Sequence, residues 1–299
     1  MNYRNLFDKL AIKILFDEPM SKHTTFAIGG IADVFAVPSA ENELLQLSNV
    51  AKQYNLPIVF LGNGSNVLVN DKGIRGLVVS MKGLEEIVVR NTTITAGAGV
   101  LLGKIANVAA DNELTGLEFA AGIPGTVGGA VYMNAGAYDG QIGDIIKSVR
   151  VLQENGKIVT VTLDNLKFGY RHSILQDKKE IVVSASFDLK KDNRDNIKQK
   201  MLDFQQRRRD RQPLNYSSAG SIFKRPVGYY AAALIDECGL KGLTVGKAMV
   251  SDKHAGFIVN TGGATANDVL ILIKQIQDIV FEKKGVRLET EIVVLGGKE

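Results

Sequence analysis

The sequence predicts an α+β protein built from two or three domains. Residues 33–69 read as strand, helix and strand; short β runs dominate after residue 77; a second mixed unit starts after Pro213. A length of 299 residues fits about two domains, with three small ones possible, and a hydrophobic content of 45% is ample for packed cores.

The first segment has a clear helix between two strands. VFAV is the first strand, and Ser39 is a candidate N-cap with Glu41 and Glu43 in the first turn. The apolar residues at helical spacing are Leu44, Leu47, Ala51 and Tyr54. The helix is expected to end at 55–57, before PIVFLG, which reads as a buried strand.

The middle of the chain is mostly β. LVVSM, EIVVR and TITAGAGV are short strands, residues 101–112 form a helix, and EIVVSASFDL is a later strand. The clearest hairpin is KSVRVLQENGKIVTVT, with Asn155 and Gly156 at its turn. A polar helix is expected over 195–211.

The last part reads as helices alternating with strands. Helices are expected over 229–238 and 266–284, the second capped by Thr265 or Thr261. Strands are expected at LTVGKAMV, FIVN and EIVVLG, and Glu291 enters the final one. The main boundary is placed near 200–215 and a weaker one near 70–80.

Composition excludes several classes of protein. No apolar run approaches the ~20 residues of a membrane span, and the N-terminus lacks the features of a signal peptide. Cys238 is the single cysteine and is expected to be a small core residue, and the three histidines are far apart, so no metal site is predicted. The net charge of +4 is mild, and no basic and aromatic pattern indicates nucleic acid. We therefore expect a cytoplasmic protein.

Two stretches rich in glycine suggest a bound cofactor. LGNGSNVLV follows a strand, and more than half of residues 120–140 are Gly or Ala. Glycine lets consecutive backbone N–H groups converge on an anion, so GNGSN could bind a diphosphate. The alternative is that the glycines only form tight turns and close-packed loops. Neither a Rossmann fingerprint nor a Walker A motif is present.

Three polar residues stand in apolar surroundings. They are Arg171 in FGYRHSIL, Ser221 in SSAGSIFKRP with Lys224 three residues on, and Glu291 in RLETEIVVLG. Each has an alternative without a function: Arg171 in a surface ion pair, Ser221 in a turn and Glu291 at an exposed strand position. G-x-S-x-G is absent, so a hydrolase has no support. In QQRRRDRQP, Arg207 and Arg211 could hold a phosphate, or the arginines could simply suit the helix dipole.

Seven motifs in series carry a family resemblance. They are TTFAIGGIADVFAVP, LGNGSNVLV, GLEFAAGIPGTVGGAVYMNAGAYDG, FGYRHSIL, QPLNYSSAGSIFKRP, KHAGFIVN and LETEIVVLG. From about residue 20 to the C-terminus the chain resembles the UDP-N-acetylenolpyruvoylglucosamine reductases (UDP-N-acetylmuramate dehydrogenases) of bacterial peptidoglycan synthesis. No tyrosine lies between Arg171 and Tyr216, so it resembles the shorter class that lacks a tyrosine-bearing loop.

The resemblance implies a two-lobed FAD-binding module of the vanillyl-alcohol-oxidase (PCMH) type followed by a C-terminal α+β substrate domain. Lobe 1 would be 1–75, lobe 2 76–205 and the substrate domain 206–299. The FAD would be non-covalent, since no His or Cys lies beside GNGSN. The implied cofactor-binding residues are Gly62, Asn63, Gly64, Ser65, Asn66, Gly122, Ile123, Pro124, Gly125, Thr126, Gly128, Gly129, Ala130, Asn134, Ala135, Gly136 and Ala137.

The implied reaction uses NADPH as co-substrate and a UDP-sugar as substrate. A hydride would pass from flavin N5 to the enolpyruvyl C3, and Ser221 would give a proton to C2. Arg171 and Glu291 would polarise the substrate carboxylate, although Glu289 differs from Glu291 only in motif position. Lys224, Arg207 and Arg211 would bind anionic parts of the substrate. The family implies no nucleic-acid or membrane partner, and we expect a monomer.

Two other functions are alternatives on the fold that the resemblance implies. One is an FAD-dependent oxidase of hydroxy acids or sugar lactones on the same module; AGSIFKRP and LETE argue against it. The other is a non-catalytic binder of nucleotide sugars, against which the intact Arg171, Ser221 and Glu291 argue.

Overall fold

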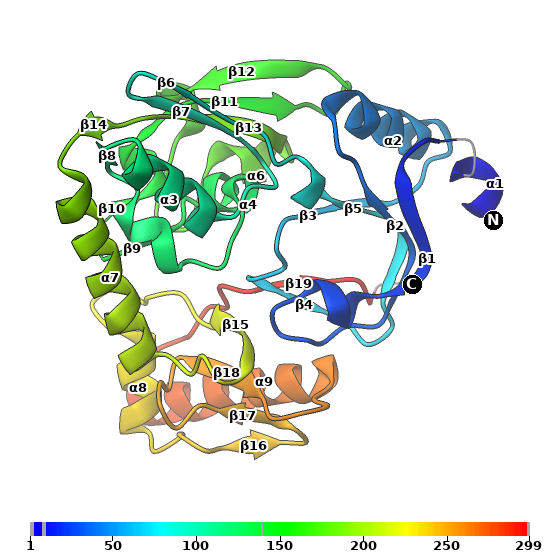
Figure 1. Ribbon diagram of the computed structural model, residues 1–299. Coiled ribbons are helices and arrows are strands. Elements are labelled where there is room, and N and C mark those ends of the chain that lie inside the picture. The colour runs from blue at the N-terminus through cyan, green and yellow to red at the C-terminus, as the bar shows by residue number, and fades with distance from the viewer. Residues whose placement is uncertain (1–2, 8–9, 139, 298–299) are drawn as a thin grey trace. The chain divides into compact units, whose positions relative to one another are not determined.

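The computed structural model describes residues 3–7, 10–138 and 140–297. The chain divides into two compact units. The first comprises residues 1–16, 34–63 and 76–208, and the second comprises 17–33, 64–75 and 209–299. Each unit is thus built from three segments that lie far apart in the chain. The predicted domains, with boundaries at 75/76 and 205/206, are instead continuous stretches of the sequence. Figure 1 shows the elements of both units.

A five-stranded antiparallel sheet forms the centre of the first unit. Its order is β12 (Ile158–Thr162), β11 (Ile146–Leu152), β13 (Ile181–Asp188), β7 (Thr93–Gly97) and β6 (Ile87–Arg90). β11 and β12 form the predicted hairpin, and Gly156 has a φ of 84° at its turn. Helices α3 (Leu102–Asp111) and α4 (Val127–Tyr132) lie on one side of the sheet (Figure 1).

The strand–helix–strand segment is confirmed with two corrections. It comprises β2 (Ile31–Val37), α2 (Glu41–Gln53) and β3 (Ile58–Leu61), which pairs in parallel with β5 (Ile74–Ser80). Ser39 is not the N-cap of α2. That position is Ala40, and the backbone N–H and hydroxyl of Ser39 bond Glu43 at 2.7 and 3.0 Å. Only Leu61 of β3 is buried, so this strand is half-buried instead of fully buried.

Short elements complete the first unit. The single-turn helices are α1 (Tyr3–Phe7), α5 (Leu163–Leu166) and α6 (Ile174–Lys178), and the two-residue strands are β8 (Leu114–Thr115), β9 (Gly136–Ala137), β10 (Gly140–Gln141) and β14 (Lys190–Lys191). Helix α7 (Arg194–Arg211) is polar as predicted and buries only Ile197 and Met201. Strand β1 (Lys13–Pro19) joins β2, β5 and β3 in one sheet. The 3-10 turns of this unit are η2 (Met81–Gly83), η3 (Glu118–Gly122) and η4 (Ile142–Asp144), whereas η1 (Met20–His23) lies in the second unit.

The second unit packs helices against an antiparallel sheet. The strand order is β15 (Ser217–Ser221), β18 (Phe257–Asn260), β17 (Ala248–Val250) and β16 (Thr244–Val245). Helix α8 (Ala231–Glu237) packs on α9 (Ala266–Lys284), which contacts β16 and β17. Thr265 caps α9 through a capping box, as one of the two predicted caps. Glu291 lies before the last strand, because β19 (Val293–Leu295) begins two residues later; it pairs in parallel with β4 (Val67–Val69).

Buried side chains explain why early segments belong to the second unit. Phe26, Ile28 and Leu68 are buried in one apolar cluster with residues of β15, α8 and α9. Cys238 is buried in the same cluster, as expected of a core residue. No helix in the described ranges is long and apolar enough to cross a membrane.

Candidate functional site

The two glycine-rich stretches meet in the first unit. The side-chain amide of Asn63 donates to the carbonyl oxygen of Pro124 at 2.6 Å. A β-carbon added at Gly62 would overlap the hydroxyl of Thr126, so this position requires glycine. Residues separated by about sixty positions in the sequence therefore form one surface of backbone.

Backbone donors gather in the loop that follows β3. Within the described chain, the N–H groups of residues 62–66 donate no hydrogen bond to the protein. Gly64 has a φ of 65°, and a β-carbon at this position would overlap the carbonyl oxygen of His23. Because backbone N–H groups without a protein acceptor need a partner, this loop fits an anionic group such as a diphosphate.

Several glycines of the long stretch are also explained by packing. A β-carbon at Gly128 would come within 2.8 Å of the Ala98 β-carbon, and one at Gly136 within 2.7 Å of the Gly140 carbonyl oxygen. Close packing within the protein is therefore enough to explain the glycine at these two positions. Gly129, in contrast, is exposed, and a β-carbon there would meet nothing nearer than Thr126 Oγ1 at 3.7 Å.

The Asn134 side chain is already used inside the protein. It is 2% exposed, donates to the Gly169 carbonyl at 2.9 Å and to Gln141 Oε1 at 3.1 Å, and accepts from the Gly143 N–H at 2.9 Å. With φ at 45°, it turns the chain after α4. Any contact of Asn134 with a cofactor must therefore come from its backbone. The remaining small and apolar positions of the stretch carry no polar side chain, so they too would contribute only backbone and shape. They are Ile123, Gly125, Ala130, Ala135 and Ala137.

Arg171 lies over the end of this stretch. It is half-buried, its Nη2 donates to the Gly136 carbonyl at 3.3 Å, and its guanidinium carbon is 5.1 Å from the centre of the Tyr170 ring. Its φ of 55° is unusual for a residue with a β-carbon. The structure thus brings this predicted residue to the glycine-rich stretch, against a backbone acceptor.

Arg208 is the residue that sequence reasoning left unassigned. A β-carbon at Gly122 would lie 3.1 Å from Arg208 Cδ and 3.9 Å from its Nη1. Burial lowers the pKa of the Arg208 guanidinium, while Tyr138 acts in the opposite direction. In the described residues it has no hydrogen bond or ion pair. A half-buried, unpaired cation beside Gly122 is suited to an anionic ligand. The sequence could not single out Arg208, because the four arginines of this short run look alike and only the structure shows that Arg208 is half-buried beside Gly122.

The other three arginines of the run, Arg207, Arg209 and Arg211, are exposed. Arg207 pairs with Asp203 one turn earlier in α7, at 2.7 Å, and its guanidinium lies 5.9 Å from the centre of the Phe204 ring. Phe204 itself stacks on Tyr138, with 4.6 Å between ring centres. Arg207 is therefore engaged at the helix surface, which is the plainer of the two alternatives for this run.

In the second unit, Ser221 ends a strand that is distorted just before it. The pairing of β15 with β18 shifts between Ser218 and Ser221, and Gly220 has a φ of 75°. Such a bulge redirects the following side chain. Ser221 is half-buried, and its hydroxyl makes no hydrogen bond within the described residues. A hydroxyl in this state can bond a ligand without first breaking a protein contact.

Two extended segments place the charged residues near Ser221. Thr290 and Phe223 form an isolated antiparallel bridge, flanked by Lys224 N–H to the Glu289 carbonyl at 2.9 Å and Glu291 N–H to the Ile222 carbonyl at 2.7 Å. The Lys224 ammonium is 3.5 Å from Glu289, which is exposed, whereas Glu291 is half-buried. The Asn66 amide donates to the Glu291 carbonyl at 3.2 Å, so the GNGSN loop holds Glu291.

His254, near the start of the KHAGFIVN segment, folds its ring back onto the residues that follow it. Its Nδ1 accepts from the Gly256 N–H at 3.1 Å, and its ring meets Phe257 edge-on at 4.9 Å. Burial lowers the pKa of this imidazole and so favours its neutral form. Among described residues, no group of three or more His, Cys, Asp or Glu could hold a metal ion.

Comparisons with known proteins agree on one family. A profile described as "UDP-N-acetylenolpyruvoylglucosamine reductase, C-terminal domain" matches residues 212–295, and one described as "FAD binding domain" matches 32–162. Proteins named UDP-N-acetylenolpyruvoylglucosamine reductase are 52% identical in Caldanaerobacter subterraneus (96% of this chain, 95% of the relative) and 50% identical in Agathobacter rectalis (95% and 94%). The crystal structure of such a reductase from Thermus caldophilus matches with a TM-score of 0.82 at 36% identity, over 95% of this chain and 99% of that one. The predicted fold class, an FAD-binding module with a separate C-terminal domain, is confirmed.

Proposed function

Since the chain belongs to the family of UDP-N-acetylenolpyruvoylglucosamine reductases, we propose how its own residues perform that family's reaction. The reaction is the NADPH-dependent reduction, through FAD, of UDP-N-acetylglucosamine enolpyruvate to UDP-N-acetylmuramate, a precursor of peptidoglycan. Hydride transfer from NADPH to the enolpyruvyl carbon C3 is the chemistry that the bound flavin supplies.

The glycine-rich stretches hold the cofactor. The N–H groups of residues 62–66 bind its diphosphate, and residues 122–137 lay backbone along the rest of it. The bond from Asn63 to Pro124 holds the start of the first loop, residues 62–63, against the second stretch. Arg208, beside Gly122, adds a positive charge for the same diphosphate.

Ser221 supplies the proton to C2 of the substrate. The observation that carries this role is its half-buried hydroxyl, which follows the left-handed Gly220 and bonds nothing in the described protein. A serine is a weak acid, so the negative charge that develops at C2 must be stabilised elsewhere. Arg171 and Glu291 orient and polarise the substrate carboxylate into which that charge spreads.

Lys224 and the exposed Arg211 bind anionic parts of the UDP-sugar. Lys224 gives up its contact with Glu289 when a phosphate or carboxylate competes for it, because an exposed ion pair contributes little stability. Arg207 takes part only after leaving Asp203. We further propose that the enzyme acts as a monomer in the cytoplasm.

The substitution Ser221→Ala tests the proposal through the two half-reactions. The rate of flavin reduction by NADPH, followed without oxygen by loss of visible absorbance, should remain within about twofold of wild type. Reoxidation by the enolpyruvyl UDP-sugar should slow by a factor on the order of 10²–10⁴, which is the usual effect of removing a proton-transfer group. Reoxidation at the wild-type rate would show that Ser221 is not the proton donor.

The competing oxidase function predicts a different result with the wild-type protein. Reduced flavin would then be reoxidised rapidly by oxygen and unaffected by the enolpyruvyl UDP-sugar. A protein that stays colourless after incubation with FAD would contradict both functions.

A further inference from the structure

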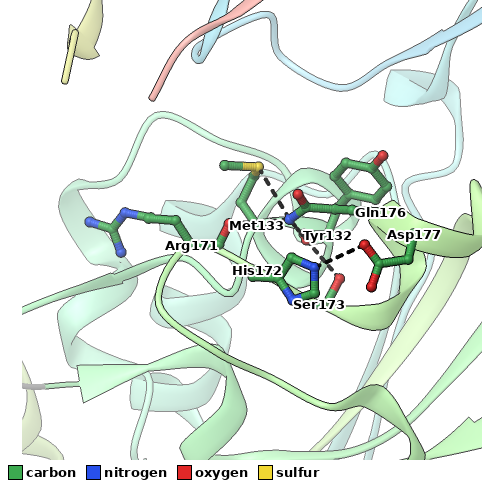
Figure 2. A network of polar contacts seen from close by, with 7 residues as sticks. All are labelled: Tyr132, Met133, Arg171, His172, Ser173, Gln176 and Asp177. Atoms are coloured by element: carbon green, nitrogen blue, oxygen red, sulfur yellow. Dashed lines mark hydrogen bonds and ion pairs between the residues drawn. The ribbon is translucent and has the colours of Figure 1, made fainter. Parts of the chain in front are cut away.

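The side chain of Gln176 joins two segments of the first unit that the sequence keeps apart (Figure 2). Its amide Nε2 donates to the Tyr132 carbonyl at 2.8 Å and to the Arg171 carbonyl at 3.2 Å, and lies 3.8 Å from Met133 Sδ. All of these partners are acceptors, so the NH₂ group must face them and the amide oxygen must point away. One amide thus binds the end of α4 and the backbone of Arg171 at once.

The bond to Arg171 acts on a residue in a costly conformation. Arg171 has a φ of 55°, in the left-handed region that side chains with a β-carbon avoid. A hydrogen bond to its carbonyl fixes the direction of the next peptide group and so holds this conformation. Without it, Arg171 can relax to an ordinary backbone conformation, which redirects the guanidinium.

Neighbouring bonds tie the same two segments together. The Ser173 hydroxyl donates to the Tyr132 carbonyl at 2.7 Å, and the Asn134 amide donates to the Gly169 carbonyl at 2.9 Å. The guanidinium of Arg171 reaches Gly136 at 3.3 Å. Residues 169–176 are therefore attached to residues 132–136 at several points, and Gln176 also bonds the carbonyl of Arg171 itself.

We propose that Gln176 is a positioning residue for Arg171, which it holds in the left-handed conformation against the glycine-rich stretch. The proposal rests on the role of Arg171 at the substrate carboxylate given above. Gln176 touches neither substrate nor cofactor in this role; it sets the direction from which the guanidinium meets the substrate. It therefore affects the step that consumes the UDP-sugar and leaves the step that consumes NADPH alone.

The test uses the FAD-loaded enzyme and the variants Gln176→Leu, Arg171→Ala and their combination. Gln176→Leu should slow flavin reoxidation by the enolpyruvyl UDP-sugar about tenfold to a hundredfold, the usual effect of misplacing a reacting group by about 1 Å. Flavin reduction by NADPH should stay within about twofold of wild type. The double variant should be no slower than Arg171→Ala, because the two residues act as one unit.

A matched control separates this effect from loss of stability. Gln153 is another half-buried glutamine of the first unit, and its amide donates to Glu180 at 2.7 Å. Gln153→Leu also removes a hydrogen bond, and it should leave both half-reactions within about twofold of wild type. If Gln153→Leu slows reoxidation as much as Gln176→Leu, the positioning role is wrong.

The variant Gln176→Glu gives a signature that packing alone cannot produce. Its carboxylate has the same shape but would face two carbonyl oxygens without a proton to donate, whereas its protonated form can donate one bond. Burial beside two carbonyl oxygens raises the pKa of a carboxyl group above its ordinary value of about 4.3. The reoxidation rate relative to wild type should therefore rise as the pH falls from about 8 to about 5.5. A ratio that does not change with pH would contradict the proposal.

The remaining outcomes separate this inference from the proposed function. If Arg171→Ala is slow and Gln176→Leu is not, the role of Gln176 is wrong and that of Arg171 stands. If the two effects add in the double variant, Gln176 does not act through Arg171. If the wild-type flavin is not reoxidised by the UDP-sugar, or Arg171→Ala leaves that step unchanged, the assignment of Arg171 fails and this inference fails with it.

Discussion

The amide of Asn63 donates to the carbonyl of Pro124 over 2.6 Å, and this bond connects the loop after β3 to the loop before α4. Asn63 and Pro124 both belong to the first unit, and both loops have the composition of a cofactor-binding loop. Neither loop has a regular element to hold its shape at this point, so their mutual bond fixes one against the other. Four predictions follow from contacts of this kind.

Asn63→Ala should weaken the binding of FAD to the apoprotein. The lost bond is worth about 1 kcal/mol, which corresponds to an increase in Kd of about fivefold. Quenching of flavin fluorescence on titration with apoprotein measures this directly. Asn107→Ala is the control, because Asn107 also donates to a carbonyl, that of Gly103, but on the surface of α3. Equal Kd values for the Asn63 variant and the wild type would show that the bond does not organise the cofactor site.

Arg208→Met should act in opposite directions on the apoprotein and on FAD binding. Burial disfavours the charged guanidinium, so the neutral side chain should raise the melting temperature of the apoprotein slightly. Loss of a charge-assisted contact to the diphosphate should raise the Kd for FAD about tenfold to a hundredfold.

The control for this prediction lies on the same helix. Arg194 is exposed and pairs with Asp111 at 2.6 Å, so Arg194→Met should leave the Kd for FAD unchanged. An unchanged FAD Kd in Arg208→Met, together with a raised KM for the UDP-sugar, would assign Arg208 to the substrate instead.

Asp71→Ala should destabilise the second unit. The Asp71 carboxylate accepts from the N–H groups of Ala266 at 2.7 Å and Asn267 at 2.9 Å, so it caps α9 from nearly two hundred residues away in the chain. Removing a cap of this kind costs about 1 kcal/mol, with a further contribution from the helix dipole. Thermal unfolding followed by circular dichroism measures the loss. Asp236→Ala, which removes an exposed ion pair with Lys241, should cost about half as much or less.

His254 should make stability fall in mild acid. Burial, assisted by the positive charge of Lys241, lowers the pKa of this imidazole in the folded state. The unfolded chain therefore binds more protons near its ordinary value of about 6.5, so the free energy of unfolding decreases as the pH falls through and below that value. Asn in place of His254 keeps an acceptor for the Gly256 N–H but cannot titrate.

Urea unfolding at about pH 7.5 and about pH 5.5 tests the point. The decrease in the free energy of unfolding between the two pH values should be smaller in His254→Asn than in the wild type. Equal decreases would assign the acid sensitivity to other groups.

Local patterns predicted the elements whose signals are local. The hairpin of β11 and β12, with Gly156 at its turn, and the helix α9, with its cap at Thr265, follow from neighbouring residues and are found as expected. The motif series likewise identified the family, because each motif is a short contiguous run. Two details were wrong, one because of a side chain four residues away and one because of a segment distant in the chain. Ser39 bonds Glu43 instead of capping α2, and extended pairing with residues 222–224 holds Glu291 outside β19.

The sequence by itself determined the α+β class, the FAD-dependent reductase family and the short runs that carry its chemistry, since these depend on residue types at close spacing. Only the tertiary structure decided which residues act together. Phe26 and Leu68 share a core with α9, Asp71 caps that helix, Arg208 turns toward Gly122, and Gln176 holds Arg171. In the first three cases the partners are tens to hundreds of residues apart, and in the last the bond depends on a left-handed backbone, so neither composition nor periodicity contains the information.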